Sequence, residues 1–128
     1  MSLSIPKLNE LQEYYNRQDL LEKVVEQIQK DFNWFSLEIK FTNNLELSAY
    51  QELYQQILPL IEEMLNDDYI KLTSMLYRID IDEDFLNRRL KETPNADTDE
   101  VITDLIIKRE LQKVIIKQIY SSGIKPST

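Results

Sequence analysis

The chain has 128 residues, of which 42% are hydrophobic and 30% charged, with a formal net charge of −8 and neither cysteine nor histidine. A chain of this length forms one domain, and the missing thiol and imidazole groups exclude disulfide frameworks, zinc, haem and iron–sulfur sites, and nucleophiles that act with Cys or His. With one glycine and four prolines it has too few turn residues for an all-β fold. We therefore predict an all-α helical bundle over residues 1–128, with a frayed tail at about 124–128.

The first long helix is predicted from residue 7 to about residue 36. Its apolar residues alternate steps of four and three, which keeps them on one stripe of a helix. They are Leu21, Val25, Ile28, Phe32, Phe35 and Ile39. Residues 37, 39 and 41 also alternate as strand residues do, so we end the helix between 35 and 39 and treat 40–47 as a connection.

The central section is predicted to be kinked or broken. Ser48 and Gln51 have the form of a capping box ahead of a helix over 49–66, which Pro59 is expected to kink rather than end. Two shorter helices, over 69–79 and 83–92, each follow acidic residues that favour a helix N-terminus.

The last helix is predicted over 98–122, after a second capping-box pattern at Asp97 and Glu100. Its apolar residues cover more of the circumference than a one-sided stripe does. Either this helix lies at the centre of the bundle, or one side packs inside the chain while Ile107, Leu111 and Val114 form a two-fold dimer interface.

Charge is unevenly distributed along the chain. Residues 41–100 carry 5 basic and 14 acidic groups, whereas residues 101–128 carry 5 basic and 2 acidic groups. The basic residues of the last helix are expected to lie on its solvated face near the negative end of its dipole, with pairing to the acidic middle section as the alternative. They are Lys108, Arg109, Lys113 and Lys117.

Few residues suggest chemistry. The run from Asp80 to Asp84 places acidic residues at the first, third and fifth positions of a calcium loop, but Phe85 and Lys91 stand where that loop requires Gly and Glu. We predict no catalytic, cofactor-binding or metal-binding residue. A speculative polar site consists of Arg78, Asp80 and Asp82, although Arg78 near a helix end is also explained by the helix dipole and neighbouring carboxylates.

Two segments resemble a group of small helical proteins of Bacteroidetes-type bacteria that have no assigned activity. They are Leu76-Tyr77-Arg78-Ile79-Asp80 and Val101-Ile102-Thr103-Asp104-Leu105-Ile106-Ile107-Lys108-Arg109-Glu110-Leu111. The resemblance implies a helical fold and a bacterial cytoplasmic setting, and it implies no catalytic residue.

The preferred function is a non-enzymatic protein–protein interaction module of the cytoplasm, whose partner is a second copy or another protein. A strongly acidic chain without a signal peptide or an apolar span is expected to bind neither nucleic acid nor membrane. Two alternatives remain open. One is a small-molecule-binding protein or an acid–base enzyme using carboxylate, Tyr and Lys groups, and the other is an acidic inhibitor or nucleic-acid mimic.

Overall fold

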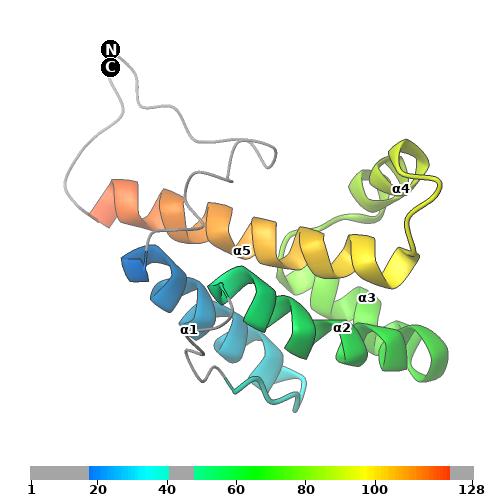
Figure 1. The fold of residues 1–128 in the computed structure, drawn as a ribbon, viewed down its shortest axis with the longest axis horizontal. Helices are drawn as coiled ribbons and strands as arrows, with labels where there is room; N and C mark the ends of the chain where they lie inside the picture. Colours follow the sequence, from blue (N-terminus) through cyan, green and yellow to red (C-terminus); the bar gives the residue numbers. More distant parts are fainter. Residues whose placement is uncertain (1–17, 41–47, 122–128) are drawn as a thin grey trace.

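A computed structural model describes residues 18–40 and 48–121, and these residues form five α-helices and no strand (Figure 1). The predicted all-α class is therefore confirmed. The helices, in chain order, are α1 (Gln18–Trp34), α2 (Ala49–Asp67), α3 (Tyr69–Arg78), α4 (Glu83–Glu92) and α5 (Thr98–Ser121). Each predicted helix corresponds to one of these five helices. The predicted start of the first helix over 7–17, the connection over 41–47 and the frayed tail lie outside the described residues.

Helix α1 ends in a turn that the sequence builds without glycine. The N–H of Leu37 donates to the carbonyl of Phe32 at 2.9 Å, and the N–H of Ser36 donates to that of Asn33 at 3.0 Å. Ser36 takes the left-handed conformation between them, with φ of 62°. This pair of bonds is the Schellman motif that ends many helices, and it ends α1 at Trp34, one residue before the predicted range of 35–39.

Helix α2 begins at the predicted capping box. The hydroxyl of Ser48 accepts from the N–H of Gln51, and the Gln51 side chain accepts from the N–H of Ser48. The second predicted box is not formed, because the carboxylate of Asp99, rather than that of Asp97, accepts a backbone N–H at the start of α5. Helix α2 is continuous through Pro59, as predicted.

Replacing Pro59 by Ala is expected to stabilise the protein. Pro59 is exposed in the middle of α2, where it removes one helical hydrogen bond, and Ala restores it without disturbing the core. The expected gain is about 1–3 kcal/mol, measured by urea unfolding followed by circular dichroism. Glu63→Ala, at an exposed position of the same helix, is the control and should change stability by less than about 0.5 kcal/mol. Lower stability of Pro59→Ala would show that the proline fits a bend that the fold needs.

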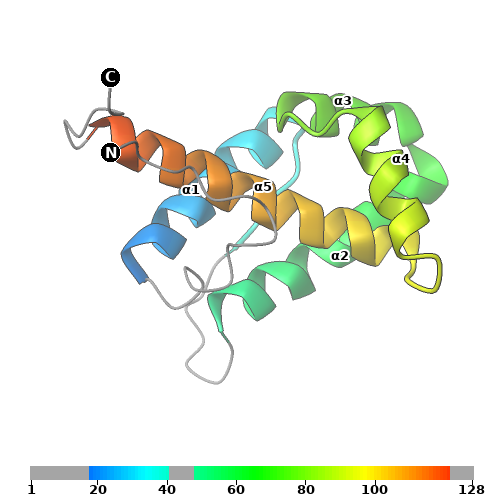
Figure 2. The same ribbon diagram turned by 90° about the horizontal axis from the view of Figure 1, so that it is seen from above.

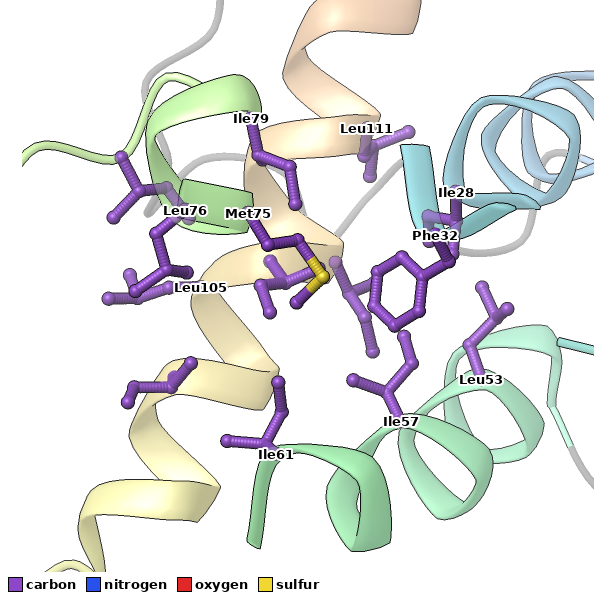
Figure 3. Packing of buried hydrophobic residues seen from close by; sticks show 14 of the residues in the cluster. Ile28, Phe32, Leu53, Ile57, Ile61, Met75, Leu76, Ile79, Leu105 and Leu111 are labelled. Atoms are coloured by element: carbon purple, nitrogen blue, oxygen red, sulfur yellow. The ribbon is translucent and has the colours of Figure 1, made fainter. Parts of the chain in front are cut away.

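Helix α5 is the centre of the bundle. It packs against α1, α2 and α4, with α1 toward its C-terminal half and α3 and α4 toward its N-terminal half (Figures 1 and 2). Leu111 lies among the buried side chains of Ile79, the C-cap residue of α3, and of Ile28 and Phe32 from α1 (Figure 3). Two sides of α5 are buried because several helices surround it.

The interface predicted at Ile107, Leu111 and Val114 is wrong. All three side chains are at most 4% exposed within a single chain, so they belong to its core and leave nothing for a second subunit to cover. The central-helix alternative is therefore the correct one. None of the five described helices, including the long α5, combines the length and the apolar character needed to cross a membrane.

Candidate functional site

The three residues of the predicted polar site do not form one site. Arg78, at the end of α3, points to α1, where its Nε lies 3.1 Å from Oδ1 of Asp31. Asp80 lies beyond α3 with its carboxylate 3.7 Å from Nη2 of Arg109 on α5. Asp82 is the N-cap of α4 and accepts from the N–H of Phe85 at 2.7 Å. Asp80 and Asp82 share a cleft, whereas Arg78 belongs to a cluster of charges in the interior.

This buried ionic cluster consists of Asp31, Arg78, Glu110 and Lys113, and it joins α1, α3 and α5. The Lys113 ammonium lies 3.5 Å from Oδ2 of Asp31 and 2.8 Å from Oε1 of Glu110. Gln27 also donates to Oδ2 of Asp31, at 3.3 Å. Asp31 and Glu110 are 3% and 0% exposed, so the two carboxyl groups are held away from water.

The two carboxyl groups have opposite pKa shifts. Burial and the hydrogen bond with Asp31 raise the pKa of Glu110 to about 8, against the opposing effect of Lys113. Burial acts to raise the pKa of Asp31 as well, but hydrogen bonds from Glu110 and Gln27 and the charges of Lys113 and Arg78 lower it overall. Glu110 is therefore a neutral acid at pH 7 that donates to the Asp31 carboxylate.

Protonation also accounts for the environment of Glu110. Within the described part of the chain neither of its oxygens accepts an aligned hydrogen bond, because Lys113 approaches as an ion-pair partner without hydrogen-bond geometry. A buried carboxylate in this position would be poorly solvated, whereas a carboxylic acid has a donor that Asp31 satisfies.

A second polar feature is the arginine cleft, a cavity of about 540 Å³ between α4 and α5. Its apolar part is formed by Ile81, Phe85 and Leu105. Its charged residues are three arginines and three carboxylates: Arg88, Arg89, Arg109, Asp80, Asp82 and Glu92. The cleft is thus formally neutral and amphipathic, with one apolar wall beside a guanidinium-rich one.

Arg109 is incompletely satisfied in this cleft. Its Nη1 donates to Oε1 of Gln112, and its Nη2 lies 3.7 Å from Asp80, which is too long for a hydrogen bond. Its Nε is buried and has no hydrogen-bond partner among the described residues. The Nε and Nη2 edge of a guanidinium can donate two parallel hydrogen bonds to a carboxylate. In Arg109 neither of these nitrogens donates a hydrogen bond to a described residue, although Nη2 forms an ion pair with Asp80.

Asp80 faces the cleft from a strained backbone position. It follows α3 in the left-handed conformation, with φ of 69°, between the bonds from Asp80 N–H to Tyr77 and from Ile81 N–H to Leu76. This is again a Schellman turn with a residue other than glycine at its left-handed position. Asp tolerates that conformation better than most residues, and the turn aims its carboxylate toward α5.

The outer surface of α3 carries large apolar side chains in water. Ile70 is 79% exposed and Tyr77 is 83% exposed, while Tyr69 at the start of the helix is 57% exposed. Trp34, at the end of α1, is 69% exposed and lies against Arg78, whose guanidinium is 4.4 Å from the ring centroid. We call Trp34, Tyr69, Ile70, Ser74 and Tyr77 the α3 face.

Several acidic residues of the middle section lie close together at the N-terminal end of α5. Glu62 of α2 is exposed and lies near Asp97 and Asp99, and a hydrogen bond with Asp99, some desolvation and the surrounding negative charges raise the pKa of Glu62. Burial and nearby carboxylates also raise the pKa of Tyr54. In the described ranges no group of three or more acidic residues has the arrangement of a metal site.

The buried ionic cluster was not predicted from the sequence, because Lys113 and Glu110 stand in a charged run that is typical of a solvated helix face. One signal was present: Glu110 is four residues after Ile106 and four before Val114, both of which are buried. It therefore lies on an apolar side of α5. Among the described residues, the predicted pairing with the middle section is found for Arg109 and Asp80, whereas Lys113 pairs with Asp31 in the first helix.

No protein-family model, curated protein or solved structure matches the chain. The resemblance of 76–80 and 101–111 to small helical bacterial proteins therefore stays a prediction, and function is argued from the geometry.

Proposed function

We propose that the protein is a non-enzymatic interaction module of a bacterial cytoplasm, and that the α3 face binds a second copy of the chain. The main support is the exposure of four large apolar side chains on the short helix α3 and on the adjacent end of α1. They are Tyr69, Ile70, Tyr77 and Trp34. Monomeric proteins rarely leave such side chains together in water, and Trp, Tyr and Arg are the residues that dominate protein interfaces.

The α3 face is complementary to itself. Ile70, Ser74 and Tyr77 follow one another at helical spacing on the side of α3 that faces away from the core. If two copies pack with their α3 helices antiparallel, Ile70 of each meets Tyr77 of the other, and the small Ser74 side chains lie near the two-fold axis. The small residue at the centre lets the two helices approach closely, while the large residues fill the ends.

Charges on α3 favour the same arrangement. Exposed Asp67 and Asp68 stand at its N-terminus and Arg78 stands at its C-terminus. Antiparallel packing brings the acidic end of each helix to the Arg78 end of the other and aligns the two helix dipoles favourably. Arg78 is held for this contact by the buried Asp31 carboxylate.

Catalysis is the weaker alternative for these features. Among the described residues, the carboxyl group with a strongly displaced pKa is that of Glu110, which is enclosed in the core and does not line the arginine cleft. A general acid has to reach the atom it protonates, and a substrate in that cleft would not meet Glu110.

Sedimentation velocity over a concentration series tests the proposal. The face is small, so wild type is expected to form a weak dimer that grows with concentration. Tyr77→Glu places a charge against Ile70 of the other copy and should weaken dimerisation by at least about tenfold, without loss of helicity because Tyr77 is exposed. Asn87→Glu adds the same charge at an exposed position on α4 and should dimerise like wild type. A wild type that is monomeric at every concentration, or a Tyr77→Glu variant that dimerises normally, would overturn the proposal.

A further inference from the structure

The arginine cleft is independent of the α3 face, since none of its lining residues belongs to that face. Its volume of about 540 Å³ lies in the range of small-molecule sites, and it combines an apolar wall with a few converging polar groups, as such sites do. Ile81 and Leu105 are buried in the core, whereas Phe85 is only partly buried and leaves apolar surface open in the cleft.

We propose that the arginine cleft binds an organic monocarboxylate with an apolar body, and that Arg109 is the residue that anchors the carboxylate. The Nε and Nη2 edge of Arg109, which donates no hydrogen bond to a described residue, donates to the two oxygens of the ligand carboxylate. Because Nε is buried, the guanidinium turns slightly toward the cleft as the ligand enters. The apolar body then rests on Phe85, the partly buried residue of the apolar wall.

Asp80 marks the position of the ligand carboxylate. Within residues 18–40 and 48–121 it is the carboxylate paired with Nη2 of Arg109, its side chain is 69% exposed, and the distance of 3.7 Å leaves it without a hydrogen bond to that nitrogen. A ligand carboxylate replaces it at closer range, and Asp80 swings into water. This exchange keeps the number of negative charges beside Arg109 unchanged.

The charges of the cleft favour a single negative charge on the ligand. Glu92 lies 3.5 Å from Arg89, and Asp82 is held as the cap of α4, so both carboxylates stay in place when a ligand binds. Arg88 lies over the ring of Phe85, with 5.8 Å between the guanidinium carbon and the ring centroid, and adds a cation beside the apolar wall. A dianion such as phosphate is repelled by the carboxylates of Asp82 and Glu92, and it has no apolar body to contact the apolar wall.

The test is an NMR titration of the full-length, ¹⁵N-labelled protein with sodium benzoate, read at the Nε–H resonance of Arg109. We expect a saturable shift of that resonance and of amides in α4 and α5. Benzamide, which has the same ring without the charge, and inorganic phosphate, which has charge without the ring, should each bind at least about tenfold more weakly.

Variants assign the effect to Arg109. Arg109→Lys keeps the charge but loses the two-bond edge, so benzoate affinity, followed at the α4 amides, should fall by at least about tenfold. Lys91→Gln removes a charge from an exposed position of α4 outside the cleft and should leave the affinity unchanged. No saturable shift with benzoate, equal binding of benzamide or of phosphate, or full affinity in Arg109→Lys would each overturn the proposal. None of these results depends on dimerisation, which the sedimentation experiment reads separately.

Discussion

Leu111→Glu is expected to unfold the protein rather than to separate two subunits. Leu111 is 0% exposed in the single chain and lies at the point where α1, α3 and α5 meet (Figure 3). Removing a buried leucine side chain costs about 2–5 kcal/mol, and an unpaired carboxylate in its place adds a desolvation penalty of several kcal/mol. Together these costs match or exceed the whole stability of a typical domain, about 5–15 kcal/mol.

Circular dichroism and light scattering measure this outcome together. The variant should lose most of its helical signal and give an expanded or aggregated species, whereas Asn87→Glu, with the same new residue at an exposed position, should keep both the signal and the size of wild type. A Leu111→Glu variant that stays helical and differs only in oligomeric state would restore the dimer interface on α5 that the structure excludes.

The helices were predictable because their signals are local. Spacing of apolar residues, the capping box at Ser48 and the acidic starts of α3 and α4 lie within a few residues of the element they define. The continuity of α2 through Pro59 was predictable for the same reason, since strong helical spacing continues on both sides of the proline.

The surroundings of α5 were not predictable to the same degree. Apolar residues around most of a helix indicate that two sides of the helix are buried. The same pattern is expected whether those sides pack against helices of the same chain or against a second copy. The structure resolves this through the packing of α1 and α2 against α5, which depends on contacts between residues far apart in the sequence.

The polar sites show the same limit more sharply. Arg78 stands near Asp80 and Asp82 in the sequence, yet its partner is Asp31, which is 47 residues away. Sequence neighbours on a helix end point in different directions, and only the arrangement of α1 against α3 decides which carboxylate an arginine meets. The exposure of Ile70 and Tyr77 was not predictable for the same reason. An apolar residue in a helix is expected to be buried, and only the packing of the helix shows that its other side supplies the core.

Stability is expected to fall as the pH rises from about 5 to 8, and Glu110 is the cause. The pKa of Glu110 is about 8 in the folded protein, against its ordinary value of 4.5, so the folded chain keeps a proton that the unfolded chain loses over this range. The stabilising contribution is complete below the ordinary value and is lost as the pH passes through the raised one. At about 1.4 kcal/mol per pKa unit, the loss amounts to roughly 3–5 kcal/mol.

Asp31 acts in the opposite direction at lower pH. Its pKa is lowered in the folded protein, so its contribution is present above its ordinary value of 3.8 and is lost as the pH falls below that value. The buried pair is therefore most stabilising in mildly acidic solution. The chain has no histidine, so no side chain that ordinarily titrates between pH 5 and 8 competes with Glu110 in setting the slope.

Glu110→Gln should remove this pH dependence. The amide is close in shape to the protonated acid: its N–H₂ group donates to Asp31 as the acid proton does, and it has no proton to lose. In urea unfolding followed by circular dichroism, the variant is expected to match wild type within about 1 kcal/mol at pH 5 and to exceed it by a few kcal/mol at pH 9. The control Glu63→Gln, which changes an exposed carboxyl group on α2, should keep the wild-type slope. A wild-type stability that is flat from pH 5 to 9, or a Glu110→Gln variant with an unchanged slope, would show that Glu110 is ionised in the folded core. The pair would then be two carboxylates held together by Lys113, with Arg78 bound to Asp31 alone.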